Sequence, residues 1–488
     1  MNTSRRRFFQ VAGVAGAGIL SGGFASCNRQ TQVNEGSSLA SIKEAAGRAH
    51  MQHFNMSGYA APKLETVRIG FIGLGNRGPG AVSRISNIEG VEIKALCDKN
   101  PERVERAQKI LERKGLSLAQ DYSGSEDAWK ELCTSPDIDL VYICTPWSLH
   151  AAMCIYAMEN GKHVATEVPA AVSVDEAWQL VETSERTKKH CMMLENCCYD
   201  FFELLTLNMA RQGFFGEVVH VEGAYIHDLL VNNFGKDSYS DMWRLRENQQ
   251  RNGNLYPTHG LGPVCQILNI NRGDKMEYLT SMSTDDFQMG KIAAEKAVQE
   301  GFYEQFATGS YRGNMNSTTI RTNKGKTIMI QHDVTSPRPY SRIHLVSGTE
   351  GVARKYPLPG KIAKGHEWFD ADEMKVLEEQ YTPEILKLVG EMAREVGGHG
   401  GMDFIMDWRL IDCLRNGIPL DQDVYDAALW SVIAPLSEWS VANRSNSIDV
   451  PDFTHGKWQT NEPVDITLSK GGTTGIRVKE EAENQLSI

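Results

Sequence analysis

The sequence predicts an α/β protein in which a doubly wound parallel sheet is followed by a second α/β domain with a mostly antiparallel, open sheet. The stretch 67–78, VRIGFIGLGNRG, is an apolar strand that runs into glycines, and strand and helix patterns then alternate to about residue 198. From about residue 199 alternating strand-like runs dominate, and helical patterns return at 402–416 and 421–440. These three observations together predict the two-part architecture.

The glycines Gly73, Gly75 and Gly78 form G-x-G-x-x-G where the strand should turn into a helix. The first permits a tight turn, the second lets the backbone approach a pyrophosphate, and the third lets helix and strand pack closely. A second apolar strand, 91–97, ends at Asp98, the expected distance for the acid that binds the adenosine ribose hydroxyls. The pattern favours a dinucleotide site over a glycine turn without a ligand. The loop residues expected to contact the dinucleotide are Gly73, Gly75, Asn76, Arg77 and Gly78.

Further cofactor contacts are expected beyond the carboxyl ends of the later parallel strands, at 139–144, 162–166 and 191–196. For each loop the alternative is an ordinary connection without a ligand. The expected cofactor is NAD, because Asp98 repels the extra phosphate of NADP, although the nearby basic side chains of Lys99 and Arg103 weaken that inference. The loop residues assigned to the cofactor are Trp147, Ser148, Leu149, His150, Glu167, Val168 and Asn196.

Helices are predicted between these strands. The segment 101–114 is amphipathic and begins with proline, and 150–161 ends at a glycine. A helix at 174–189 is preceded by Ser173, which stands three residues before Glu176, the spacing of a capping box.

The N-terminus predicts export. Ser4, Arg5, Arg6, Phe8 and Phe9 fit the twin-arginine pattern, and a short apolar run follows at 11–25. Small residues precede Cys27, so a lipid anchor there and ordinary signal cleavage both remain open. We expect a periplasmic or cell-envelope protein. An exported dinucleotide enzyme must hold its cofactor tightly and regenerate it in every turnover, because a free nicotinamide pool is not expected outside the cytoplasm.

Composition limits the partners. The formal charge is −11, and loss of Arg5, Arg6 and Arg7 with the signal would make it −14, so nucleic acid is not an expected partner. Apart from Cys27, nine cysteines show no paired zinc spacing, and folding in a reducing cytoplasm argues against disulfides. We predict buried thiols, no metal site and a homo-oligomer.

Several segments resemble known families. RIGFIGLGNRG, ALCDKNPE, ICTPWSLHAAMCIYAMENGKHVATEVP and LEN are similar to the Gfo/Idh/MocA oxidoreductases, which pair a Rossmann domain with an α/β domain that binds a sugar or polyol. EVP, WRLRENQQRNGNLYPTHGLGPV and GGHGGMDF are similar to glycoside hydrolase family 109, the NAD-dependent α-N-acetylgalactosaminidases. The resemblance implies release of terminal N-acetylgalactosamine from glycans of blood group A type. The expected divisions are a signal at 1–27, a linker or arm at 28–65, a Rossmann domain at 66–198 and a substrate domain at 199–488.

One position departs from the parent family. Its dehydrogenases usually carry Glu-Lys-Pro, where the lysine helps to move the proton of the substrate hydroxyl, but this chain has Val168 there. Another base must therefore serve.

The second domain supplies candidates for that base. Tyr256 and His259 are three residues apart and share a face of a helical turn, and histidine titrates near neutral pH. His399 lies among glycines that leave backbone open to a ligand, although a loop histidine without function fits equally well. Tyr225, His259 and His399 are the predicted catalytic residues. The predicted substrate contacts, several of them implied by the resemblance, are Tyr225, Arg244, Tyr256, Pro257, Thr258, His259 and Tyr340.

The expected reaction is redox-neutral. The sugar is oxidised at C3, a base that is either Tyr225 or His259 removes the C2 hydrogen, the aglycone leaves C1, water adds, and C3 is reduced again. Most glycosidases hydrolyse the bond with a pair of catalytic carboxylates, but no motif in this sequence indicates such a pair. The alternatives are an exported sugar oxidoreductase with captive cofactor and a non-catalytic glycan-binding lipoprotein.

Overall fold

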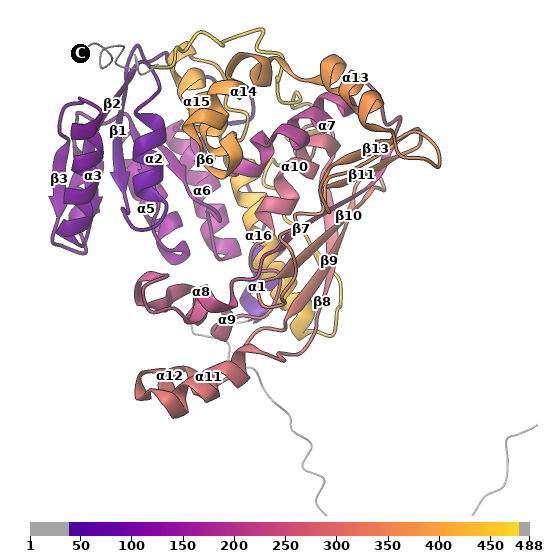
Figure 1. Cartoon of the computed structure of the whole chain (residues 1–488), viewed down its shortest axis with the longest axis horizontal. Helices are drawn as coiled ribbons and strands as arrows, with labels where there is room; N and C mark the ends of the chain where they lie inside the picture. Colours follow the sequence, from indigo (N-terminus) through magenta and orange to yellow (C-terminus); the bar gives the residue numbers. More distant parts are fainter. Residues whose placement is uncertain (1–38, 478–488) are drawn as a thin grey trace, which may run out of the picture. The chain divides into compact units, whose positions relative to one another are not determined.

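The structure is a computed structural model that describes residues 39–477 (Figure 1). The predicted signal at 1–27, with Cys27, and the first part of the predicted arm lie outside the described residues.

The first sheet has six strands in the order β3-β2-β1-β4-β5-β6, and every neighbouring pair is parallel. The chain reverses direction across the sheet between β1 and β4, which is where a doubly wound fold binds its ligand. The predicted parallel sheet is thereby confirmed. Its strands are β1 (Val67–Ile72), β2 (Val91–Asp98), β3 (Gln120–Ser123), β4 (Leu140–Ile143), β5 (His163–Thr166) and β6 (Cys191–Met193).

Two elements differ from the predicted bounds for local reasons. Helix α5 begins at Trp147 instead of residue 150, because Pro146 is extended and the helix starts directly after it. Strand β6 ends at Met193 instead of continuing to residue 196, because the Glu195 side chain accepts a hydrogen bond from the Cys197 amide and starts the 3-10 helix η1 (Asn196–Tyr199).

Helices pack around this sheet. Asn100 caps α3, whose first residue is the predicted proline, and the capping box of Ser173 and Glu176 at α6 is present. The helices of this half are α2 (Gly78–Ile85), α3 (Pro101–Arg113), α4 (Ala128–Thr134), α5 (Trp147–Glu159) and α6 (Val174–Thr187).

The second sheet has eight strands in the order β13-β12-β11-β7-β10-β9-β8-β14. Only β7 and β10 pair in parallel, so the predicted mostly antiparallel sheet is also confirmed. The strands are β7 (Val218–Ile226), β8 (Met276–Ser283), β9 (Met315–Thr322), β10 (Thr327–Asp333), β11 (Leu345–Gly348), β12 (Val352–Arg354), β13 (Lys361–Ala363) and β14 (Ile448–Asp449).

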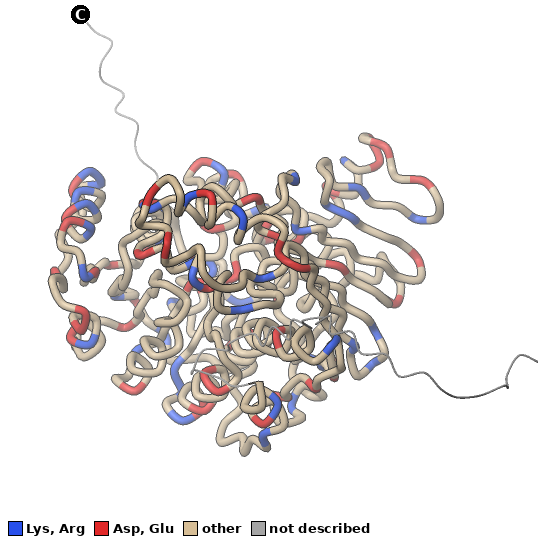
Figure 2. The backbone as a smooth tube through the Cα atoms, turned by 90° about the horizontal axis from the view of Figure 1, so that it is seen from below, with Lys and Arg blue, Asp and Glu red and all other residues tan. Residues whose placement is uncertain are grey.

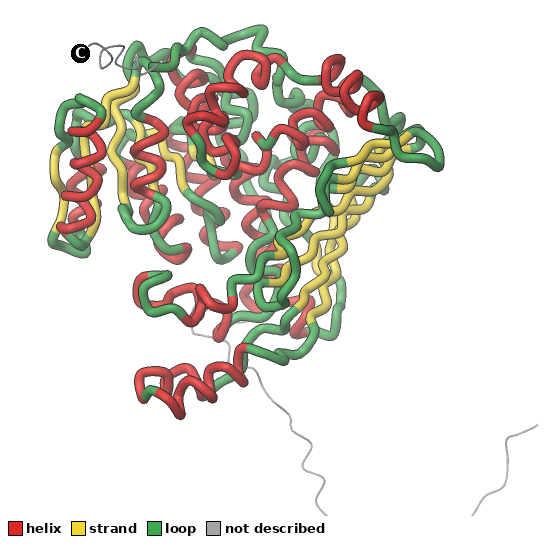
Figure 3. Tube along the Cα trace, in the orientation of Figure 1, coloured by secondary structure: helices red, strands yellow, loops and turns green. Residues whose placement is uncertain are grey.

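Helices cover one face of this sheet and leave the other open (Figure 3). Helix α10 packs on β7 and α16 packs on β8, and the alternation of buried and exposed residues along β9 follows from this one-sided cover. The helices of this half are α7 (Phe201–Arg211), α8 (Leu230–Phe234), α9 (Trp243–Gln250), α10 (Thr258–Leu268), α11 (Met289–Gln299), α12 (Glu304–Ala307), α13 (Ala371–Tyr381), α14 (Glu384–Val396), α15 (Met402–Asn416) and α16 (Val424–Ala442).

The described part of the predicted arm packs on the body of the protein. It contains the helix α1 (Leu39–Ala46), which lies against α6 and α16. The buried carboxylate of Glu185 then holds the following segment, accepting from the backbone amide of His53 at 3.1 Å and lying 3.2 Å from His50 Nε2. The Tyr425 hydroxyl donates to the same carboxylate at 2.9 Å.

The nine described cysteines are all free thiols, and all but Cys144 are buried. This confirms the prediction of small buried side chains. Burial raises the pKa of the Cys97 and Cys133 thiols to about 12.

Acidic and basic residues are interspersed along the described chain, so neither sign is confined to one element (Figure 2). No helix among residues 39–477 is both long enough and apolar enough to cross a membrane.

A buried ion-pair cluster stabilises the second half. Glu203 on α7 accepts from Lys355 Nζ at 2.7 Å and from Arg342 Nη2 at 2.8 Å, and all three side chains are buried. Although burial alone would raise the pKa of Glu203, the two cations hold it well below its usual value. A group with a lowered pKa contributes stability above the pKa of the unfolded state, about 4.3 for Glu, and this contribution is lost as the pH falls through the folded value.

We therefore expect Glu203→Gln to lower the free energy of unfolding by about 3–5 kcal/mol at pH 7, because it leaves two buried cations underpaired. Urea unfolding at pH 7 and at pH 3.5 measures this, and the difference from wild type should be smaller at the lower pH. Glu384→Gln is the matched control, because Glu384 forms an exposed pair with Lys387. Equal stability of the Glu203 variant and wild type at pH 7 would contradict the assignment.

Candidate active site

A cavity of about 600 Å³ lies between the carboxyl end of the first sheet and elements of the second half. Of the residues predicted for the site, only Gly78, Pro257, Thr258 and Tyr340 do not line it. Those that do are Gly73, Gly75, Asn76, Arg77, Asp98, Trp147, Ser148, Leu149, His150, Glu167, Val168, Asn196, Tyr225, Arg244, Tyr256, His259 and His399.

The glycine loop has the geometry that a dinucleotide needs. Gly73 has φ +89°, and a Cβ there would lie 2.7 Å from the backbone of Cys144. A Cβ at Gly78 would lie 2.1 Å from the Gly73 carbonyl oxygen, whereas one at Gly75 would meet only Arg103, at 3.7 Å. The backbone at Gly75 is therefore open to a ligand, as the second glycine of the motif requires.

Asp98 lies at the end of β2 beside this loop. Its Oδ2 accepts from the Leu74 amide at 2.8 Å, and Arg103 Nη1 lies 3.5 Å from both carboxylate oxygens. The loop and this carboxylate together fit the diphosphate and adenosine ribose of NAD.

His150 is fully buried in the first turn of α5. Its ring nitrogens each lie 2.7 Å from a backbone carbonyl, those of Thr145 and Pro169. Burial lowers the pKa of His150. The ring thus joins the loops that follow β4 and β5, which fixes the edge of the cavity.

The carboxylate of Asp403 joins three of the predicted residues. Asn196 Nδ2 donates to it at 2.5 Å, Arg77 Nη1 at 3.1 Å, and His399 Nδ1 lies 2.9 Å away. Arg77 also donates to Glu167 at 2.7 Å. Asp403 is 1 % exposed, and although burial alone would raise its pKa, the surrounding donors and cations hold it well below its usual value.

Arg244 lies in a box of aromatic rings. Its guanidinium carbon is between 5.1 and 5.9 Å from the ring centroids of Tyr256, Trp147, Tyr239 and Tyr225. Nη1 donates to the Tyr239 hydroxyl at 3.3 Å, while Nη2 is buried without a hydrogen-bond partner among the described residues. A buried donor without a partner at the edge of a cavity indicates a ligand contact.

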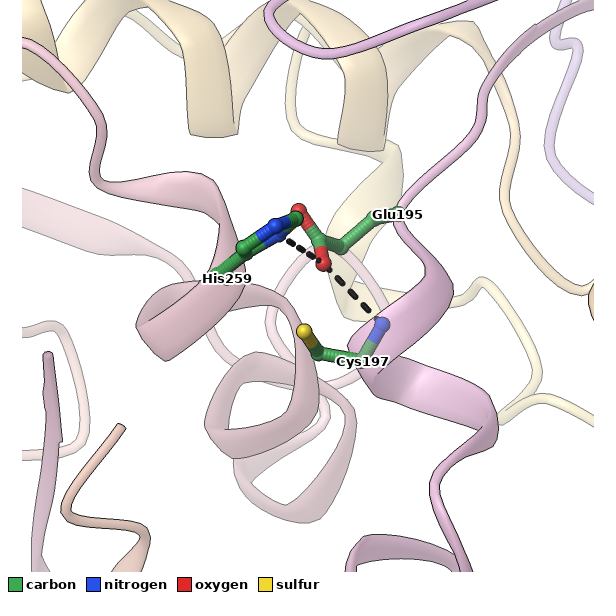
Figure 4. Close-up of side chains that lie close together, drawn as sticks. All are labelled: Glu195, Cys197 and His259. Atoms are coloured by element: carbon green, nitrogen blue, oxygen red, sulfur yellow. Dashed lines mark hydrogen bonds and ion pairs between the residues drawn. The ribbon is translucent and has the colours of Figure 1, made fainter. Parts of the chain in front are cut away.

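His259 and Glu195 form a hydrogen-bonded pair (Figure 4). His259 Nδ1 lies 2.7 Å from Oε1 of the fully buried Glu195, and Nε2 lies 3.5 Å from the Tyr256 hydroxyl. Burial alone would raise the pKa of Glu195, but His259 and further hydrogen bonds lower it below its usual value. The ionised carboxylate therefore accepts from Nδ1 and leaves Nε2 as the nitrogen available for proton transfer.

Cys197 lies beside this pair. A thiol sulfur, an imidazole nitrogen and a carboxylate oxygen come within 4.8 Å of one another here, and such atoms can bind a metal. Burial raises the pKa of Cys197 well above its usual value, so the sulfur is a thiol, and Glu195 already accepts from His259 and from the Cys197 amide. These contacts are those of the hydrogen-bonded pair of His259 and Glu195. That the site holds no metal stays a prediction.

Tyr225 is the last but one residue of β7 and lines the cavity. Its hydroxyl is hydrogen-bonded to His227 Nδ1 at 3.0 Å, and its ring centroid lies 5.5 Å from that of His259. Burial raises the pKa of Tyr225 and lowers the pKa of His227. Tyr340 packs edge-on against His227 with 5.0 Å between ring centroids, and its hydroxyl accepts from Arg342.

Sequence reasoning missed four residues of this arrangement: Glu195, His227, Tyr239 and Asp403. Signals for two of them were present. Glu195 lies at the carboxyl end of the strand predicted at 191–196, where ligand contacts are expected. His227 follows Tyr225 by two residues, which places both on one face of a strand.

Fold and site together define a dinucleotide-binding protein in which a Rossmann half is joined to a second α/β half with a mostly antiparallel sheet. Residues 67–195 match the family described as an oxidoreductase family with an NAD-binding Rossmann fold, and residues 199–460 match the glycosyl hydrolase 109 C-terminal domain. Glycosyl hydrolase family 109 protein 1 of Bacteroides fragilis (strain YCH46) is 54% identical over 422 residues, covering 82% of this chain and 88% of that protein. A Shewanella pealeana protein of the same family is 46% identical over 471 residues, covering 96% of this chain and 99% of that protein.

The chain belongs to glycosyl hydrolase family 109, and its cofactor is NAD. Among solved structures, a levoglucosan dehydrogenase in complex with NADH and L-sorbose has a TM-score of 0.59 at 17% identity, covering 80% of this chain and all of that one. The Lactobacillus casei myo-inositol dehydrogenase in complex with NAD(H) and myo-inositol has a TM-score of 0.53 at 17% identity, covering 80% of this chain and 99% of that one. These likenesses show a shared fold.

Proposed function

We propose that this glycoside hydrolase releases terminal α-linked N-acetylgalactosamine from glycans of blood group A type. The observation that carries the proposal is the buried Arg244, whose Nη2 has no partner within residues 39–477 and indicates a polar ligand group in the cavity that His259 also lines. The planar guanidinium suits the acetamido carbonyl or a pair of sugar hydroxyls. The surrounding tyrosine and tryptophan rings provide the apolar surface on which a sugar ring packs.

The cofactor offers a route to glycoside cleavage that does not depend on a pair of catalytic carboxylates. Bound NAD supplies a reversible hydride acceptor for the sugar C3 carbon. The residues that would hold it are the glycine loop, Asp98 and the loops after β4 and β5. Their geometry fits, as the open backbone at Gly75 shows.

We assign the removal of the proton from the C3 hydroxyl to Tyr225 together with His227. Val168 is apolar and cannot take the place of the lysine of related dehydrogenases. Because its pKa is lowered, His227 is neutral near pH 7 and its Nδ1 accepts from the Tyr225 hydroxyl. A proton that reaches Tyr225 from a sugar hydroxyl can therefore pass on to His227.

We assign the removal of the C2 proton to His259, acting as a general base. A carbonyl at C3 acidifies the C2 hydrogen, and the base that removes it must be unprotonated near neutral pH. The raised pKa of Tyr225 keeps its hydroxyl protonated, so it is not available to take the C2 hydrogen. On His259, Glu195 holds Nδ1 at 2.7 Å, while Nε2 has only a long contact, 3.5 Å, with the Tyr256 hydroxyl. Loss of the aglycone from C1, addition of water with return of a proton to C2, and reduction of the C3 carbonyl back to the alcohol would complete a redox-neutral hydrolysis.

Turnover of an aryl N-acetyl-α-galactosaminide in deuterated water tests this route. Removal and return of the C2 proton predicts about one deuterium at C2 of the released sugar, seen by NMR, with no net change in nicotinamide absorbance. Direct displacement at C1 predicts no deuterium at C2. A stable carbonyl product, with no released N-acetylgalactosamine, would instead support a sugar oxidoreductase.

A further inference from the structure

A short segment of the second half lies against the nucleotide-binding half. This segment, residues 238–242, connects α8 and α9 and includes the 3-10 helix η2 (Ser240–Met242); we call it the strap. In Figure 1 the helices on either side of it lie below the parallel sheet. It has no part in the proton transfers assigned above.

Three contacts join the strap to the nucleotide-binding half. Asn76 Nδ2 donates to the Ser238 carbonyl at 2.6 Å, and Arg103 Nη2 donates to Ser240 Oγ at 2.7 Å. Lys99 Nζ lies 3.6 Å from the carboxylate of Asp241. The three partners come from the glycine loop, the end of β2 and α3, the elements that surround the adenosine and diphosphate of a bound dinucleotide.

The backbone of the strap is in an uncommon conformation. Asp241 and Met242 have φ of +56° and +51°, a left-handed region that non-glycine residues rarely adopt. Met242 is 2 % exposed, so the strap is anchored by a buried side chain at its end. Non-glycine residues keep such a conformation only where the surrounding contacts enforce it, and such sites are often functional.

The strap also forms a wall of the cavity. Gly73, Gly75 and Asp98 line it, and so do Ser240 and Asp241. Because Asn76, Arg103 and Lys99 contact the strap, a dinucleotide seated on the glycine loop would lie next to it.

We propose that the strap retains NAD by closing over its adenosine–diphosphate portion, so that the cofactor leaves only when the contacts of Asn76, Arg103 and Lys99 with the strap are broken. Such retention is the property that the predicted export of this enzyme requires, since released NAD could not be replaced outside the cytoplasm. The inference rests on NAD binding and not on the identity of the sugar.

The test is the rate of NAD release from Ser240→Ala, which removes the side chain that holds Arg103 to the strap. Protein purified with its cofactor is mixed with excess isotopically labelled NAD, and exchange is followed by mass spectrometry of the bound nucleotide. We expect release about tenfold faster than in wild type, the effect of losing one hydrogen bond to a charged group. Binding of ADP-ribose should weaken by a similar factor, because that probe keeps the adenosine and diphosphate and lacks the nicotinamide.

The matched control is Ser238→Ala, a serine change in the same segment whose contact with Asn76 uses the backbone carbonyl and is kept. It should exchange NAD at the wild-type rate. Thermal melting with NAD present shows whether each variant is folded. Unchanged release from a folded Ser240→Ala variant, or equal acceleration in both variants, would overturn the proposal, and a variant that loses NAD affinity but not ADP-ribose affinity would also contradict it.

Discussion

Replacement of His259 by alanine is expected to lower kcat/KM for an N-acetyl-α-galactosaminide by about 10³-fold, the middle of the range for a positioned general base. The change removes the Nε2 that we assign to the C2 proton and leaves Glu195 without its partner. Initial rates with an aryl glycoside measure it, and the deuterium content of substrate recovered in deuterated water reports the proton-removal step directly.

His220→Ala is the control for the loss of a histidine, because His220 lies on β7 with Thr327 as its partner and does not line the cavity. It should keep the wild-type rate. The NAD content of the His259 variant should equal that of wild type, which separates a catalytic defect from loss of cofactor. A His259 variant that still exchanges the C2 hydrogen at the wild-type rate would refute this assignment.

The second large effect is expected at Glu195. Glu195→Gln keeps the shape of the side chain but removes the negative charge that orients the Nδ1 proton of His259, so we expect kcat to fall about 10²-fold or more. Because the pKa of Glu195 is lowered, its carboxylate stays ionised through mildly acidic pH, and the acid limb of the wild-type pH–rate profile should not come from Glu195. A profile from pH 4 to pH 8 for wild type and variant measures both points.

Glu222→Gln serves as its control, since Glu222 lies beside His220 on β7 outside the cavity. If Glu195→Gln turned over at the wild-type rate with an unchanged profile, Glu195 would have only a packing role.

Local patterns explain why much of the fold was predictable. The glycine spacing after β1, the proline at the start of α3 and the capping box of Ser173 each specify structure within a few residues. The bounds failed where a side chain acted just beyond the pattern, as at Glu195, which ends β6 early by capping η1.

The composition of the site was less predictable because its contacts join distant segments. Glu195 meets His259 only because α10 packs on η1, and Asn196 meets Asp403 across 207 residues of sequence. The proposal of His259 over Tyr225 as the C2 base likewise draws on the burial of the tyrosine and on the partner of the histidine, neither of which the sequence gives. The strap could not be predicted from the sequence, because the residue types of Asp241 and Met242 do not indicate that their φ angles are positive.

The shared carboxylate of Asp403 has a consequence for engineering this enzyme. One anion fixes Arg77 beside the glycine loop, Asn196 after β6 and the ring of His399. A substitution of Asp403 that is intended to change the sugar specificity would therefore also disturb residues expected to hold the coenzyme. Changes of specificity are better sought at the β7 residue Tyr225, which lines the cavity and has no contact with Asp403 among the described residues.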